Sequence, residues 1–146
     1  MNEKIVAVSG GFDPVHIGHL ELLRDAKSLG DKLVVILNND NWLKNKKGYA
    51  FMDEEEKKEI LGEFECVDEV FITEHGERVE DPSVCEALRK IKPDVFANGG
   101  DRKKHNVPEY DLCEELGIDM TFNVGGEKKQ SSSKLVENAR KRGMSK

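Results

Sequence analysis

The sequence predicts an α/β protein, with an open parallel five-stranded sheet and helices on both of its faces. Short apolar segments alternate with helical segments along the whole chain, and such alternation gives parallel strands joined by right-handed crossovers. The segment 33–37 is continuously apolar, which is typical of a strand covered on both faces. The length of 146 residues suits one core, so we expect residues 1–146 to form one domain.

The elements follow in order along the chain. The expected strands are 4–8, 33–37, 67–72, 95–97 and 119–123. The expected helices are 17–29, 53–64, 81–91, 108–116 and 132–140. In the first helix, Leu20, Leu23, Ala26 and Leu29 recur at helical spacing. The polar segment 38–52 is expected to be a loop.

Caps and breakers fix several of these ends. Gly30 is expected to end the first helix. Asp53 is a good N-cap for the second helix. Asp81 followed by Pro82 gives the favoured order of a cap and a first-turn proline. The basic tail 141–146 is expected to be frayed.

Bulk properties exclude several classes of protein. A formal charge of −6 argues against nonspecific nucleic-acid binding, which needs a basic face. No segment resembles a secretory signal or a membrane span, so we expect a cytoplasmic protein. Cys66, Cys85 and Cys113 are widely spaced and form no CxxC pair, so neither a disulfide framework nor a zinc site is predicted.

The main chemical signal lies between the first strand and the first helix. Residues 10–19 read Gly-Gly-Phe-Asp-Pro-Val-His-Ile-Gly-His. Glycines let the backbone approach an anion, and a helix start offers unpaired N–H groups. His16 and His19 are three residues apart, so both can donate to one phosphate as its charge grows. The bland alternative is a pair of capping histidines without a catalytic role.

This element resembles the GxFDxxHxGH hallmark of the cytidylyltransferase-like nucleotidyltransferase superfamily. The resemblance implies a Rossmann-like fold, transfer of a nucleoside monophosphate from a triphosphate, a substrate-bridging Mg²⁺ ion and a homodimer. Gly11 stands where many members have Thr or Cys, which removes one side-chain donor. His16, Ile17, Gly18 and His19 also match a motif of class I aminoacyl-tRNA synthetases, but the chain is too short for their further domains.

Three weaker elements gain meaning from this resemblance. The serines at 131–133 and Lys134 precede the last helix; alone they indicate a cap, but the superfamily has a pyrophosphate-binding serine motif there. The lysines of 44–47 are alone a solvated cluster, but in the glycerol-3-phosphate cytidylyltransferase branch this segment contacts the triphosphate and the acceptor phosphate. The Asn-Gly-Gly-Asp sequence at 98–101 is good turn chemistry, and it also resembles the Gly-Gly-Asp element of the heptose-phosphate adenylyltransferase branch.

The resulting site assignments are as follows. The predicted catalytic residues are His16, His19, Lys46 and Lys134. The predicted nucleotide-binding residues are Gly10, Gly11, Phe12, Asp13, Gly18, Gly100, Asp101, Ser131, Ser132 and Ser133. The predicted acceptor-binding residues are Lys44, Lys47 and Arg102. No resident metal site is predicted. His75 and His105 are expected at the surface, with acceptor contacts left open for His105 and for Lys57, which stands where the branch usually has arginine.

These elements together predict an enzyme that transfers a nucleoside monophosphate to a phosphorylated small metabolite and releases pyrophosphate. CTP is slightly favoured over ATP, and glycerol 3-phosphate or a sugar phosphate is the expected acceptor. The alternatives are an adenylyltransferase that acts on FMN, NMN or phosphopantetheine, and a nucleotide-binding module without turnover. No membrane or nucleic-acid partner is expected.

Overall fold

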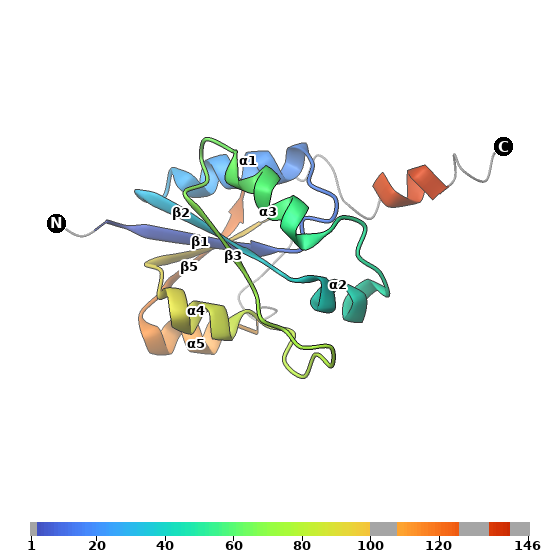
Figure 1. Ribbon diagram of the computed structural model, residues 1–146. Coiled ribbons are helices and arrows are strands. Elements are labelled where there is room, and N and C mark those ends of the chain that lie inside the picture. The colour runs from blue at the N-terminus through green and yellow to red at the C-terminus, as the bar shows by residue number, and fades with distance from the viewer. Residues whose placement is uncertain (1–2, 100–107, 126–134, 141–146) are drawn as a thin grey trace.

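A parallel sheet forms the centre of the protein in the computed structural model, which describes residues 3–99, 108–125 and 135–140 (Figure 1). The strands are β1 (Ile5–Gly10), β2 (Lys32–Leu37), β3 (Glu69–Ile72), β4 (Val95–Gly99) and β5 (Asp119–Val124). The helices are α1 (Ile17–Lys27), α2 (Asp40–Lys47), α3 (Glu54–Gly62), α4 (Cys85–Ile91) and α5 (Tyr110–Leu116). Residues 135–140 are also helical.

The strand order is β3-β2-β1-β4-β5, and every neighbouring pair is parallel. The chain runs outward from β1 through β2 to β3 and then returns to the other side of β1 for β4 and β5. The order therefore reverses between β1 and β4, which is where open α/β sheets bind ligands beyond the carboxyl ends of their strands. The predicted fold class is confirmed.

Two apolar cores lie on the two faces of the sheet, because alternate strand residues point to opposite faces. Val6 and Val8 pack with Leu23 of α1 and Leu61 of α3. Ala7 packs in the second core, whose helical members come from α4 and α5. Figure 1 shows α1 and α3 above the sheet and α4 and α5 below it. Both faces are covered, as the continuous apolar run in β2 predicted.

The segment 38–52 contains a helix, so the prediction of a loop was wrong. The side-chain oxygen of Asn39 accepts a hydrogen bond from Trp42 N, and Gly48 ends α2 in the left-handed region at φ 86°. Asn39 and Gly48 are thus the ordinary start and stop residues of a helix. Leu43 is fully buried. One anchoring leucine in an otherwise polar helix gives too weak a periodicity to detect.

Two other helix ends also differ from the prediction. α4 begins at Cys85 rather than beside Asp81, whose carboxylate instead accepts from Ser83 N in a preceding turn. Gly30 does not cap α1, because the C-cap is Ser28. A Cβ at Gly30 would lie 2.7 Å from the Lys4 carbonyl oxygen. Gly30 is therefore required for the close approach of the chain to β1.

All three cysteines are free thiols, and Cys113 is buried. Burial raises the pKa of the Cys113 thiol to about 11. In the described part of the chain, no helix is both long and apolar enough to cross a membrane.

Candidate active site at the switch point

The Gly-rich turn leaves β1 beside the point where the strand order reverses. Phe12 has φ 50°, a left-handed conformation that is uncommon for a residue with a side chain. Its ring is 3% exposed, and a Cβ at Gly10 would come within 3.1 Å of that ring. Gly10 thus makes room for the Phe12 ring. In this structure the Phe12 ring lies inside the turn.

His16 and His19 begin α1 and hold each other in place. His16 Nδ1 accepts a hydrogen bond from Gly18 N at 3.1 Å, and His19 Nδ1 accepts one from His16 N at 3.2 Å. This is the reciprocal pattern of a capping box, made here by two imidazoles. Gly18 is one of the predicted nucleotide-binding residues, and its N–H is used inside the turn.

These two bonds fix the tautomer of both rings. A neutral imidazole that accepts at Nδ1 carries its proton on Nε2. Both His16 and His19 therefore have an Nε2–H donor. Their rings are stacked, with centroids 3.8 Å apart and planes 22° apart, and the Phe12 ring packs edge-on against His19. The two histidines do cap the helix, and the same hydrogen bonds leave each ring with an Nε2–H group as a donor.

The Asp13 carboxylate ties this turn to the segment before α3. It accepts hydrogen bonds from Phe51 N and Met52 N, both at 2.6 Å. The Asp13 side chain is fully buried. Asp13 is one of the predicted nucleotide-binding residues, and in this structure its side chain points into the protein and supports the turn.

Lys57 completes this support from α3. Its Nζ donates to the Gly11 carbonyl oxygen at 3.1 Å and lies 3.5 Å from Asp13 Oδ1. Burial lowers the pKa of Lys57, and the Asp13 carboxylate opposes that shift. The Lys57 side chain is completely buried. In this structure Lys57 supports the turn from beneath.

α2 packs directly against the turn at Gly11. A Cβ at Gly11 would lie 3.0 Å from Leu43 Cδ2 and 3.3 Å from Trp42 Cζ3, which is closer than ordinary packing. The absence of a side chain at Gly11 therefore has a structural reason. It allows α2, with its lysines, to lie against the Gly-rich turn.

The three lysines of α2 have different surroundings. Lys47 Nζ donates to the Asp13 carbonyl oxygen at 3.0 Å and lies 3.7 Å from Asp13 Oδ2. Lys46 Nζ lies over the Trp42 ring at 4.8 Å from its centroid, and Lys44 is exposed. Lys47 is thus the predicted acceptor-binding lysine that the structure brings to the motif turn.

Several predicted site residues lie outside the described part of the chain. They are Gly100, Asp101, Arg102, His105, Ser131, Ser132, Ser133 and Lys134. The flanking segments are described. β4 ends at Gly99 next to β1, and Arg140 lies over the Tyr49 ring at 5.5 Å. The helical residues 135–140 therefore lie beside the segment that follows α2.

His75 is not the isolated surface histidine that the sequence suggested. Its Nε2 lies 3.1 Å from the Ser83 carbonyl oxygen, and its Nδ1 lies 2.8 Å from Thr73 Oγ1. A carbonyl can only accept, so Nε2 carries the proton and the Thr73 hydroxyl donates to Nδ1. Thr73 Oγ1 in turn accepts from Asn39 N. These hydrogen bonds join residues far apart in the sequence, so only the tertiary structure reveals them.

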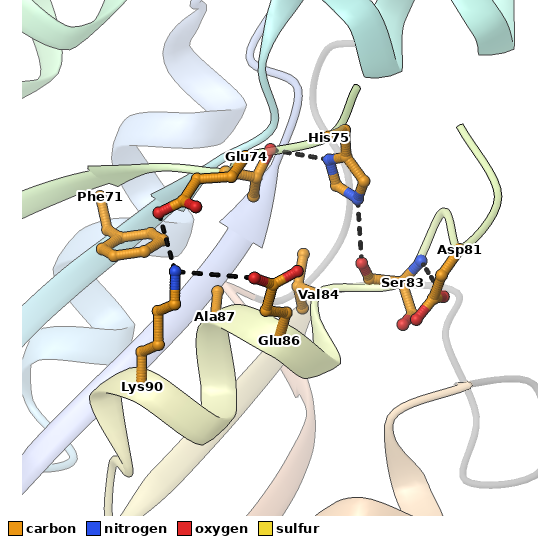
Figure 2. Close-up of a pocket in the computed structure, with 10 residues that line it drawn as sticks. Phe71, Glu74, His75, Asp81, Ser83, Val84, Glu86, Ala87 and Lys90 are labelled. Carbon is orange, nitrogen blue, oxygen red and sulfur yellow. Dashed lines mark hydrogen bonds and ion pairs between the residues drawn. The ribbon is translucent and has the colours of Figure 1, made fainter. Parts of the chain in front are cut away.

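Figure 2 shows the shallow hollow beside His75, at the start of α4. Its volume is about 50 Å³. On the side opposite His75, Lys90 lies between Glu74 at 2.8 Å and Glu86 at 3.6 Å. The hydrogen bonds and ion pairs across the hollow join the segment after β3 to α4. The segment before α4 also contacts α2, because Trp42 Nε1 donates to the Pro82 carbonyl oxygen.

Comparison with known proteins places the chain in a family. The cytidylyltransferase-like family model matches residues 7–138. The chain belongs to that family. The prediction of an enzyme of the nucleotidyltransferase class is thereby confirmed at the level of the family.

Two kinds of curated relative are similar to this cytidylyltransferase-like protein. The bifunctional protein HldE of Aliarcobacter butzleri is 32% identical over 140 residues, which are 94% of this chain and 28% of that protein. FAD synthase of Pyrococcus abyssi is 41% identical over 103 residues, which are 69% of this chain and 66% of that protein. The chain thus spans little more than a quarter of the HldE relative.

Solved structures show the same architecture. A lipopolysaccharide core biosynthesis protein from Thermoplasma volcanium superposes with a TM-score of 0.66 at 27% identity, covering 83% of this chain and 94% of that one. Pantoate-beta-alanine ligase from Francisella tularensis gives a TM-score of 0.64 at 18% identity, covering 95% of this chain and 69% of that one. The second likeness concerns the fold alone.

Proposed function

We propose that this cytidylyltransferase-like protein transfers a nucleoside monophosphate from a triphosphate to a phosphorylated small metabolite and releases pyrophosphate. The observation that carries the proposal is the stacked pair of His16 and His19, whose Nδ1 atoms are both engaged at the start of α1. The pair stands at the reversal point of the sheet. A helix N-terminus with two Nε2–H donors suits an anion whose charge grows during the reaction.

The reaction needs no nucleophile from the protein. An acceptor phosphate is ionised at neutral pH, and its oxygen attacks the α-phosphorus in line. A new P–O bond forms while the bond from the α-phosphorus to the bridging oxygen breaks, and pyrophosphate leaves with the electron pair. His16 and His19 donate to the oxygens around the α- and β-phosphates. Catalysis then consists of holding two polyanions together and stabilising the transferred group.

Lysines reduce the repulsion between donor and acceptor. Lys47 is the best placed of the described lysines, because its Nζ already lies at the Asp13 backbone. The Asp13 carboxylate keeps Lys57 and two backbone N–H groups when Lys47 turns to a phosphate. Lys44 and Lys46 extend the positive charge along α2. We propose the same role for Arg102 and Lys134 from the resemblance.

Mg²⁺ is proposed as a bridge between substrate phosphates, where it would neutralise charge on the departing pyrophosphate. Within the described residues, no three His, Cys, Asp or Glu side chains are grouped to hold a metal. The proposed Mg²⁺ would therefore be bound mainly by phosphate oxygens and water. We also propose that the protein acts as a homodimer in the cytoplasm, which sedimentation and fractionation test.

Two acceptor classes have support. The lysine-bearing α2 and the resemblance to the glycerol-3-phosphate branch favour an alcohol or sugar phosphate with CTP. The similarity to an FAD synthase favours FMN with ATP, because FAD contains an adenylyl group. NMN and phosphopantetheine complete the acceptor panel.

The test is pyrophosphate release with each of the four triphosphates against this panel of acceptors. His16→Ala and His19→Ala should each lower turnover by about a hundredfold or more. Urea unfolding should show that each variant remains folded, with the loss of a cap costing about 1 kcal/mol. Near-normal turnover in both variants would contradict the mechanism. Nucleotide binding without pyrophosphate release under any combination would instead favour a binding module.

A further inference from the structure

At the carboxyl ends of three neighbouring strands, polar side chains lie on the same face of the sheet. Ala7, Ile36 and Phe96 belong to the core beneath α4 and α5. Side chains two residues further along a strand share its face. Ser9, Asn38 and Asn98 stand two residues beyond these core positions, and we call them the polar row. The row lies at the carboxyl ends of β1, β2 and β4, where the ligands of such sheets bind.

The two asparagines of the polar row differ in their bonding. Asn98 is 3% exposed, and its Nδ2 donates to the carbonyl oxygens of Phe96 and Thr121. Asn38 is 4% exposed, but its Oδ1 is buried without a hydrogen-bond partner among the described residues. An unsatisfied buried carboxamide destabilises a protein, and such a group in a native structure calls for an explanation.

The backbone places Asn38 between the two phosphate-binding elements. Its N–H donates to the Gly10 carbonyl oxygen at 2.9 Å, so Asn38 lies beside the start of the Gly-rich turn. The next residue, Asn39, is the N-cap of α2. A ligand whose phosphate reaches Lys47 on α2 and the histidine turn would therefore pass close to Asn38.

We propose that Asn38 determines acceptor specificity by binding a hydroxyl group of the acceptor. This inference rests on the proposed function. A neutral carboxamide is matched to a hydroxyl, since it both accepts and donates. Phosphates are better matched by the lysines and the histidine turn. The implied substrate class is a phosphate ester of a polyhydroxy chain, with a hydroxyl group close to the phosphate.

The test compares Asn38→Leu with the matched control Asn98→Leu in the whole chain. If Asn38 serves a ligand, its replacement by an isosteric apolar residue should leave the melting temperature of the ligand-free protein unchanged, or raise it by about 2 to 6 °C. Asn98→Leu should lower the melting temperature, because it leaves two carbonyl groups without their donor.

The kinetic arm uses two acceptors that differ by one hydroxyl group, glycerol 3-phosphate and propane-1,3-diol monophosphate. FMN is the third acceptor, since its ribityl phosphate offers the same chemistry. The wild type should prefer an acceptor with a hydroxyl next to the phosphate-bearing carbon by about tenfold or more in kcat/KM. Asn38→Leu should lose that preference and leave the KM for the triphosphate unchanged.

Several results would overturn the inference. A fall in melting temperature as large as that of Asn98→Leu would make Asn38 a structural residue. An unchanged preference between the paired acceptors would remove Asn38 from the acceptor site. A changed KM for the triphosphate alone would assign it to the nucleotide. If the wild type releases no pyrophosphate with any acceptor, the proposed function fails first and this inference fails with it.

Discussion

Replacing Lys57 with methionine removes the buried cation beneath the Gly-rich turn while nearly conserving its volume. Lys57 Nζ is 3.5 Å from Asp13 Oδ1 and 3.1 Å from the Gly11 carbonyl oxygen, and its side chain is fully buried. Removing one partner of a buried ion pair typically lowers the free energy of unfolding by about 3–5 kcal/mol. Asp13 keeps two backbone donors and Lys47, so we expect about 3 kcal/mol.

The reverse change should cost more. Asp13→Asn leaves the Lys57 ammonium buried with the Gly11 carbonyl as its main partner, and we expect a loss near the upper end of the same range of about 3–5 kcal/mol. In the double variant neither charge is left unpaired. Its loss should therefore be smaller than the sum of the two single losses by about 2 kcal/mol or more.

The pH dependence has a definite sign. The folded-state pKa of Lys57 lies below the ordinary value of 10.5 because of burial. A lysine with a lowered pKa contributes stability that is fully present above pH 10.5 and is lost as the pH falls. The stability of the wild type relative to Lys57→Met should therefore increase between pH 7 and pH 10.5.

Urea unfolding at several pH values measures these free energies. Lys58→Met is the matched control, because Lys58 is its exposed neighbour on α3, and it should change stability by about 0.5 kcal/mol or less. Additive losses in the double variant, or a Lys57→Met variant as stable as Lys58→Met, would refute the assignment of Lys57 as a buried support of the turn.

Two further predictions follow from local packing and from burial. Gly11→Ala should destabilise by about 1–3 kcal/mol through overpacking against Leu43 and Trp42, and it should raise the KM of the acceptor because α2 must shift. An equally stable variant with an unchanged KM would contradict the close approach of α2. Burial raises the pKa of the Cys113 thiol from 9.0 to about 11. Because the folded state then holds this proton more tightly than the unfolded state, the stability from Cys113 is present below pH 9 and is lost between pH 9 and pH 11. Cys113→Ala should remove this loss, and in the native wild type a thiol reagent at pH 8 should modify Cys66 and Cys85 before Cys113.

Much of the fold could be predicted because its signals are local. The apolar run of β2 and the alternation of strand and helix predicted a parallel sheet covered on both faces, and the strand order confirms it. The His16 and His19 pattern was visible because spacing around a helix start fixes which side chains are neighbours. The family match is consistent with that prediction.

α2 was missed for a physical reason. Its sequence, Asp-Asn-Trp-Leu-Lys-Asn-Lys-Lys, has one fully buried residue, Leu43, so no apolar stripe forms. Its stability comes from the cap at Asn39, the left-handed Gly48 and contacts with Gly11. The first two signals were present in the sequence, but the partner surface was not.

The sequence by itself determined the alternation of strands and helices, the Gly-rich turn and the family of the protein, because each depends on residues close together in the chain. Tertiary structure decided which polar side chains are buried and paired beneath the turn. Asp13 and Lys57 are 44 residues apart and meet beneath the turn, while Asn38 has a buried oxygen without a partner in the described part of the chain. Burial and long-range pairing set these roles, and neither can be read from spacing along the chain.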